Sequence, residues 1–99
     1  MYTILYSEGV ADDLQRVPPG QRNQLLDRIE VQLKYEPSRR SRNRKILVGL
    51  APAWEHVEPV WELRIGEYRV FYDVDEAVPA VFIRAIRHKP PHKTTEEIL

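Results

Sequence analysis

The absence of cysteine from a chain of 99 residues excludes a disulfide-stabilised fold and a thiolate metal centre. Its 15 acidic and 15 basic side chains give no formal net charge, so an anionic partner would be recognised by a local basic surface. The start of the chain lacks the features of a signal peptide, and no segment approaches the roughly 20 apolar residues of a membrane span. We therefore expect one soluble, cytoplasmic domain over residues 1–99, without a membrane partner.

The first half of the chain is predicted to form one strand followed by two helices. Alternating apolar residues are typical of a short strand over residues 2–7. Apolar residues at helical spacing predict a short helix over about 8–17 and a longer helix over 21–35. Because only Pro-Pro-Gly at 18–20 connects them, the two helices should form an antiparallel hairpin.

The second half of the chain is predicted to form a β-meander. The segment "KILVGL" (45–50) favours a brief strand, and a loop follows. Two strands over about 60–65 and 68–74 read as a tight hairpin, and a further strand covers 80–88. The sequence therefore predicts an α+β fold with a helical hairpin packed on one face of a small, mainly antiparallel twisted sheet, in the order β-α-α-β-β-β.

The hairpin has a defined register if Gly66 and Glu67 form a two-residue turn. Arg64 then lies opposite Arg69, although like charges directly across a sheet are destabilising, so we expect an acidic group to compensate. Side chains alternate between the two faces of a sheet. The face expected under the helices carries Trp61, Leu63, Ile65, Tyr68, Val70 and Tyr72. The outer face, expected to be uncovered, carries Glu62, Arg64, Arg69, Phe71 and Asp73.

The strand over 80–88 adds residues to the outer face in one of two registers. One register adds Phe82, Arg84, Ile86 and His88, and the other adds Val81, Ile83, Ala85 and Arg87. Arginines around Phe71 on an uncovered sheet suit a polyanion with bases that can stack, such as RNA. The alternative is that Glu62 and Asp73 neutralise these arginines in a solvated surface network.

Two segments rich in basic residues contain no acidic residue. They are "RRSRNRK" (39–45), which also suits a solvated loop after a helix, and "RAIRHKPPHK" (84–93). His88 and His92 have the spacing of a helical metal-binding pair, but the two prolines between them exclude a regular helix. We therefore expect neither a metal ion nor another cofactor.

Three stretches together resemble the RelE/ParE superfamily of toxins from bacterial toxin–antitoxin pairs. They are "RKILVGL" (44–50), "WELRIGEYRVFYDVDE" (61–76) and "VFIRAIRHK" (81–89), in the order that is familiar in that superfamily. The helical hairpin and the strand order also fit, so the resemblance covers most of the chain. It implies a toxin that a cognate antitoxin protein holds inactive. RelE-like members cut messenger RNA in the ribosomal A site, whereas ParE-like members poison DNA gyrase.

The resemblance also implies which residues form a site. The arginine of the Y-R-V-x-Y strand, an active-site residue of RelE-like nucleases, falls on Arg69, and a basic residue after the last strand falls near Lys89. This chain departs from well-studied nucleases of the superfamily at two places. Val60 and Glu62 stand where those proteins have lysines, and the C-terminal tail contains no tyrosine. Histidines and lysines of the tail are the natural substitutes.

The expected site is a metal-independent ribonuclease centre. Arg69 and Arg64 would hold the phosphate through charge-assisted hydrogen bonds. His88 or His92 would act as acid and base, with further charge from Lys89. The other residues expected to bind substrate are Phe71, Arg84, Arg87, Lys93, Arg44 and Lys45. The expected partners are the antitoxin, the ribosome and mRNA, and the alternatives are a DNA gyrase inhibitor or a catalytically degenerate antitoxin-binding protein.

Overall fold

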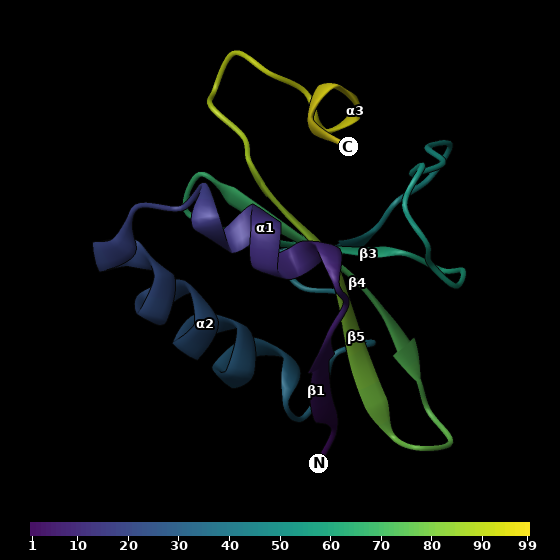
Figure 1. Cartoon of the computed structure of the whole chain (residues 1–99). Helices are drawn as coiled ribbons and strands as arrows, with labels where there is room; N and C mark the ends of the chain where they lie inside the picture. Colours follow the sequence, from purple (N-terminus) through teal and green to yellow (C-terminus); the bar gives the residue numbers. More distant parts are fainter.

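In the computed structural model, which describes residues 1–99, two helices lie on one face of a five-stranded sheet (Figure 1). The elements are β1 (Thr3–Tyr6), α1 (Gly9–Gln15), α2 (Pro19–Leu33), β2 (Arg44–Ile46), β3 (Trp61–Ile65), β4 (Tyr68–Asp75), β5 (Ala80–His88) and α3 (Thr95–Ile98). The strand order is β1-β5-β4-β3-β2, with β1 parallel to β5 and every other pair antiparallel. The predicted α+β architecture is confirmed.

Prolines determine where α2 begins. Pro18 is the N-cap and Pro19 is the first helical residue, two residues before the predicted start. A proline suits this position because its fixed φ is already helical and its missing N–H would have no partner there. At the other end, the Tyr72 hydroxyl donates to the carbonyl of Pro37 at 2.8 Å and ties the end of the helical hairpin to β4. None of the helices is both long and apolar enough to cross a membrane.

The predicted register of the β3–β4 hairpin is confirmed at every pair, including Arg64 opposite Arg69. Gly66 has a φ of +58°, which glycine adopts without steric cost, and this permits the two-residue turn. The face under the helices forms the main core. Its buried residues include Val10, Leu25, Ile29 and Leu33 from the helices and Trp61, Leu63, Ile65, Val70 and Tyr72 from the hairpin.

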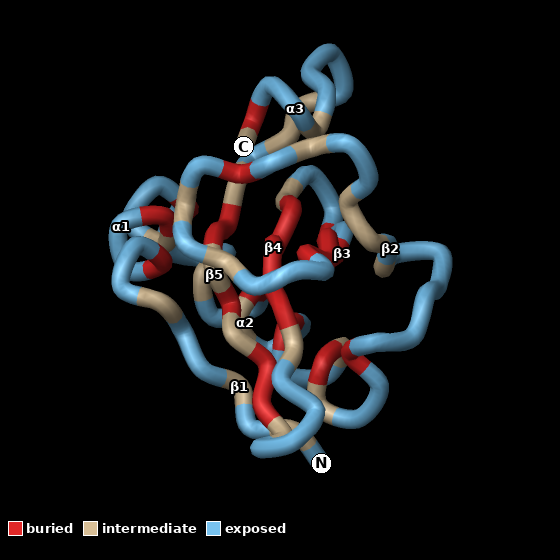
Figure 2. Tube along the Cα trace, turned by 90° about the vertical axis from the view of Figure 1, so that its right-hand side faces the viewer, coloured by how far each residue is buried: buried red, intermediate tan, exposed pale blue.

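The outer face is partly covered, contrary to the prediction. Val60, Phe71, Ala85 and Ile98 form a second buried cluster, and the partly buried residues packed on it are Leu47, Trp54 and Leu99. The segment between β2 and β3 and the C-terminal helix α3 supply this cover (Figure 1), and buried residues run along β4 (Figure 2). These covering segments have no helical or strand periodicity that would have revealed an apolar face in the sequence.

A bulge decides which β5 residues reach the outer face. Asp73 pairs with Phe82 and Phe71 pairs with Ala85, so Arg84 is an extra residue without a direct partner. Val81, Ile83 and Ile86 therefore belong to the core under the helices. Neither predicted register is correct along the whole strand, because simple alternation contains no signal for a bulge.

Glu76, in the β4–β5 turn, joins three segments that are distant in sequence. Ser38 Oγ donates to its carboxylate at 2.6 Å, and the hydroxyl of Tyr2 donates to the other oxygen. These hydrogen bonds lower the pKa of Glu76 from its ordinary value of 4.5. Because the folded-state pKa is the lower one, the stabilisation is complete above the ordinary value and is lost as the pH falls through the lowered value.

We expect Glu76→Gln to lower the free energy of unfolding near neutral pH, and the difference from wild type to narrow as the pH falls below 4.5. Urea denaturation of both proteins at neutral and acidic pH measures this. Glu96→Gln, at an exposed carboxylate without a hydrogen bond to the protein, is the matched control. A difference that stays constant across the pH range would show that the charge of Glu76 is not responsible.

Candidate functional site

A polar cavity lies on the outer face beside the β3–β4 turn. Its volume is about 250 Å³, and no hydrophobic residue lines it. Its lining residues are Arg42, Asn43, Lys45, Glu62, Arg64, Arg69, Lys89 and Thr95. We call it the Arg69 cavity. Its lining has five basic side chains and one carboxylate, an excess of four positive charges in a chain without net charge. Such a concentration of charge favours an anionic ligand.

Arg69 is the most buried of these cations, with 9% of its surface exposed. Its Nη1 donates to the carbonyls of Gly66 and Tyr68, both at 2.9 Å, which fixes the guanidinium against the turn. Its other N–H groups make no hydrogen bond to the protein and stay available to a ligand. Burial lowers the pKa of Arg69, the charge of Glu62 opposes this, and the charge of Arg64 adds to it. An anion bound in the cavity would relieve the cost of burying this charge.

Glu62, a residue of this same chain, is the acidic group expected to compensate the opposed arginines Arg64 and Arg69. It is 2% exposed, and Lys45 Nζ lies 3.4 Å from its Oε1. The hydroxyl of Thr95, in α3, donates to its Oε2 at 2.9 Å. Glu62 therefore offsets part of the repulsion between Arg64 and Arg69 and is the only carboxylate that lines the cavity.

Of the residues predicted to act in catalysis, Lys89 lines the cavity together with Arg69. The backbone N–H of Lys89 donates to the carbonyl of Glu67 at 2.6 Å, which holds the end of β5 against the hairpin turn. Arg64 and Lys45, predicted to bind substrate, also line the cavity, whereas Lys93 is exposed and does not.

The two histidines do not lie in the Arg69 cavity, contrary to the expectation of a histidine acid and base there. His88 pairs with Tyr68, on the sheet face that the helices cover, and its Nε2 lies 3.0 Å from Glu67 Oε1. His92 is exposed in the segment between β5 and α3. The reason is strand alternation, which places neighbours such as His88 and Lys89 on opposite faces.

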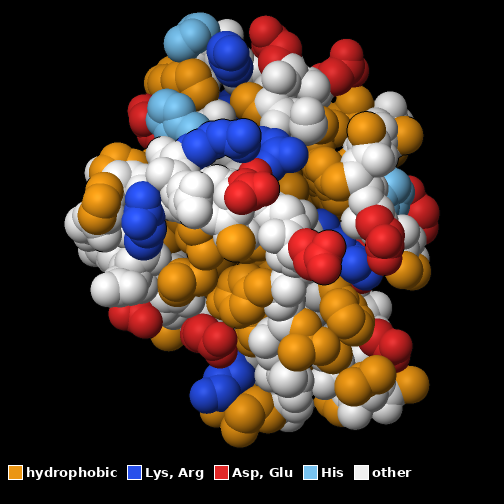
Figure 3. Space-filling view, in the orientation of Figure 1, with side chains coloured by type: hydrophobic (Ala, Val, Ile, Leu, Met, Phe, Trp, Pro, Cys, Tyr) orange, Lys and Arg blue, Asp and Glu red, His pale blue; other side chains and the backbone are white.

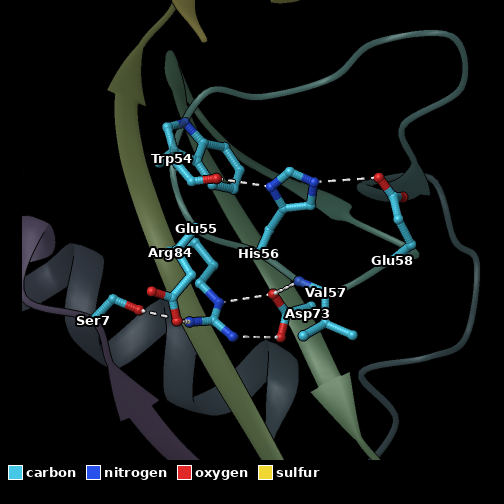
Figure 4. A network of polar contacts seen from close by, with 8 residues as sticks. All are labelled: Ser7, Trp54, Glu55, His56, Val57, Glu58, Asp73 and Arg84. Carbon is cyan, nitrogen blue, oxygen red and sulfur yellow. Dashed lines mark hydrogen bonds and ion pairs between the residues drawn. The ribbon is translucent and has the colours of Figure 1, made fainter.

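Phe71 and Arg84, both predicted to bind substrate, have structural roles instead. Phe71 is completely buried, so its ring cannot stack on a base. Arg84 Nε and Nη2 donate to the two oxygens of Asp73 at 2.7 and 3.1 Å, and Asp73 also accepts the backbone N–H of Val57 at 3.0 Å (Figure 4). This network holds the segment before β3 against the sheet, so Arg84 is not free to bind a substrate.

Arg87 and Arg44 are likewise committed to partners within the protein. Arg87 Nη1 lies 2.7 Å from Asp13 Oδ1, on α1. Arg44 Nη1 donates to the carbonyls of Gln32 and Glu36 at 2.7 and 2.9 Å, at the end of α2. Both side chains, predicted to bind substrate, are therefore occupied within the protein, because sequence spacing does not reveal acceptors contributed by other elements.

Four lining residues, Arg42, Asn43, Glu62 and Thr95, were not predicted as site residues, and Glu62 was expected only to neutralise the arginines. Arg42 and Asn43 precede β2, and the carbonyl of Asn43 accepts the backbone N–H of Arg64 at 2.8 Å. The basic run over 39–45 was the only signal for this segment. Thr95 enters through α3, whose packing over the sheet has no counterpart in the sequence pattern.

Comparisons with known proteins give both a family match and a shared fold. The model of the family described as ParE toxin of type II toxin–antitoxin system, parDE, matches residues 4–89. No curated protein sequence matches the chain significantly.

Three solved structures are similar over nearly their whole length. The archaeal RelE–RelB complex from Pyrococcus horikoshii OT3 contains a chain that is 24% identical, with a TM-score of 0.67, covering 94% of this chain and 98% of that one. A chain of the RelBE2 complex from Mycobacterium tuberculosis is 21% identical, with a TM-score of 0.64 and coverages of 89% and 98%. The isolated RelE toxin from E. coli is 16% identical, with a TM-score of 0.64 and coverages of 98% and 94%. At these identities the likeness is one of fold.

Proposed function

We propose that this chain, which belongs to the ParE family of type II toxin–antitoxin toxins within the RelE/ParE superfamily, is a RelE-like, ribosome-dependent mRNA endoribonuclease. The observation that supports the proposal best is the Arg69 cavity, with its excess of positive charge and its uncommitted guanidinium N–H groups. A phosphate of RNA matches both features. Activity on translating ribosomes would place the protein in the cytoplasm.

The proposed reaction uses the RNA's own 2′-hydroxyl as nucleophile. Its oxygen attacks the adjacent phosphorus, the bond from phosphorus to the 5′-oxygen breaks, and a 2′,3′-cyclic phosphate and a 5′-hydroxyl form. Arg69 and Arg64 would stabilise the charge on the phosphate oxygens. Glu62, as the only carboxylate at the cavity, would take the proton from the 2′-hydroxyl, and the ammonium of Lys89 would give one to the departing 5′-oxygen.

We expect Glu62→Gln to lower the single-turnover cleavage rate of ribosome-bound message about 100-fold or more, as is usual for loss of a general base. The amide keeps the size of the side chain and can still accept the Thr95 hydrogen bond. Thr95→Val, which removes that hydrogen bond and leaves the carboxylate in place, should have a smaller effect. A wild-type rate in folded Glu62→Gln protein would assign the base to another group.

Inhibition of DNA gyrase is the second candidate. Two observations favour it: the matching family model is that of ParE toxins, and neither histidine lies in the Arg69 cavity. A gyrase inhibitor would use the cationic cavity for binding and would need no proton transfer. The third alternative, a degenerate protein that only binds antitoxin, would need neither gyrase binding nor proton transfer.

A small antitoxin protein is the proposed partner in each case. Of the similar solved structures, the P. horikoshii chain comes from a RelE–RelB complex and the M. tuberculosis chain from the RelBE2 toxin–antitoxin complex. An acidic antitoxin segment would be electrostatically complementary to the Arg69 cavity.

Labelling of cells that express the toxin without antitoxin tests these candidates. We expect incorporation of labelled methionine to stop within minutes while incorporation of labelled thymidine continues. Arrest of thymidine incorporation first would instead identify gyrase as the target. Normal incorporation of both labels by cells that contain folded protein would identify the degenerate alternative.

A further inference from the structure

A second and larger hollow, the turn cleft, lies on the other side of the β3–β4 turn from the Arg69 cavity. It has a volume of about 740 Å³ between α2 and the turn. Leu25 and Ile65, two residues of the main core, are part of its lining. Its polar and aromatic lining residues include Arg16, Gln21, Gln24, Arg28, Tyr68 and His88. Figure 3 shows histidine, lysine and arginine side chains gathered toward the upper left of the molecule, over the turn and the C-terminal segment.

Residues of the turn and of the end of β5 border both hollows. Tyr68 and His88 line the turn cleft, and the residue that follows each of them, Arg69 or Lys89, lines the Arg69 cavity. Strand alternation therefore connects the hollows through two pairs of neighbouring residues. Arg69 and Lys89 also hold the turn itself, through the carbonyls of Gly66 and Glu67. A chain that leaves one hollow across the turn would enter the other directly.

We propose that single-stranded RNA passes over the β3–β4 turn, and that the turn cleft binds a nucleotide near the one whose phosphate lies in the Arg69 cavity. This inference rests on the proposed ribonuclease function. The rings of Tyr68 and His88 lie 5.4 Å apart at an angle of 53°, and the half-exposed His88 offers a surface on which a base stacks. Arg28, which has no acidic partner within the protein, supplies charge for a second phosphate.

The composition of the cleft favours RNA over an acidic peptide. Gln21 and Gln24 each present an amide with both donors and an acceptor, which suits the edge of a base. The position of the cleft beside the Arg69 cavity also favours RNA. A bound message must extend beyond the cleaved bond on both sides, and the cleft lies where the chain would continue.

Two variants, Arg28→Glu and His88→Ala, test the proposal in the full-length protein. We expect each to weaken binding of a fluorescein-labelled single-stranded RNA of about ten nucleotides by about tenfold, the scale for one stacked base or one lost phosphate contact. The concentration of ribosome-bound message at half-maximal cleavage should rise to a similar degree. The maximal rate should change little, because neither side chain lines the Arg69 cavity. Arg40→Glu makes the same charge change as Arg28→Glu at an exposed residue that lines neither hollow.

The outcomes separate this inference from the proposed function. Cleavage by the wild type with unchanged RNA binding by both variants would overturn the role of the turn cleft and leave the ribonuclease intact. Weakened capture of the antitoxin with normal RNA binding would also overturn it, and would identify the cleft as a protein-docking groove. Absence of cleavage by the wild type would overturn the proposed function and, with it, the inference.

Discussion

Replacement of Arg69 by alanine should lower cleavage of ribosome-bound message about 100-fold or more, the usual effect of removing a donor that stabilises transition-state charge. Arg69 is the most buried cation of the cavity and has free N–H groups that can form two parallel hydrogen bonds to a phosphate. Arg69→Lys keeps the charge but loses this paired geometry, so its rate should fall between those of wild type and Arg69→Ala. Single-turnover cleavage of a programmed ribosome complex measures all three.

A structural contribution of Arg69 has to be separated from its proposed contribution to the reaction. Its bonds to the carbonyls of Gly66 and Tyr68 stabilise the turn, so Arg69→Ala should also lower the free energy of unfolding. Circular dichroism and urea denaturation therefore accompany the kinetics. Arg64→Ala removes an exposed cation of the same cavity and should cost less of the rate. Cleavage at the wild-type rate by folded Arg69→Ala protein would contradict the assignment.

Asp73→Asn should lower the free energy of unfolding by about 3 to 5 kcal/mol, because it removes the charge that pairs with the largely buried Arg84. The carboxylate of Asp73 accepts two hydrogen bonds from the Arg84 guanidinium and one from the backbone N–H of Val57 (Figure 4). A cost of this size is a large part of the stability of a typical domain. Urea denaturation at constant salt measures it.

Glu55 provides the matched control for Asp73. Its Oε1 lies 3.8 Å from Nη1 of Arg84, but its side chain is 93% exposed, so Glu55→Gln should change the stability by less than about 1 kcal/mol. A double replacement of Asp73 and Arg84 by leucine should recover part of the stability lost in Asp73→Asn, because no charge is then left buried without a partner. A loss below about 1 kcal/mol in Asp73→Asn would show that water solvates Arg84 as well as the carboxylate does.

Local features of the sequence were sufficient to predict the hairpin. Alternation and the Gly66 turn define which residue faces which, and the structure has the same pairs. The covering of Phe71 was not predictable in this way, since Trp54 and Ile98 reach it from a loop and from the C-terminal helix. The bulge at Arg84 was not predictable either, because it reverses the faces of β5 without a change in residue type.

The lining of the Arg69 cavity was predictable where neighbouring strands alone supply it. Arg64 and Arg69 come from one hairpin, and Lys89 follows the strand beside it. Contacts between distant elements were not predictable. Asp13, on α1, forms an ion pair with Arg87, and Thr95 reaches the cavity from α3. Neither Asp13 nor Thr95 belongs to a sequence pattern that suggests such a contact.

Primer extension on a reporter message in cell-free translation tests the proposed ribonuclease most directly. With wild-type protein we expect new 5′ ends in phase with the codons, only on message that is being translated, and far fewer such ends with Arg69→Ala. Intact message and normal protein synthesis in the presence of folded wild-type protein would contradict the proposed ribonuclease activity. Gyrase inhibition and antitoxin binding without toxicity would then be the remaining candidate functions.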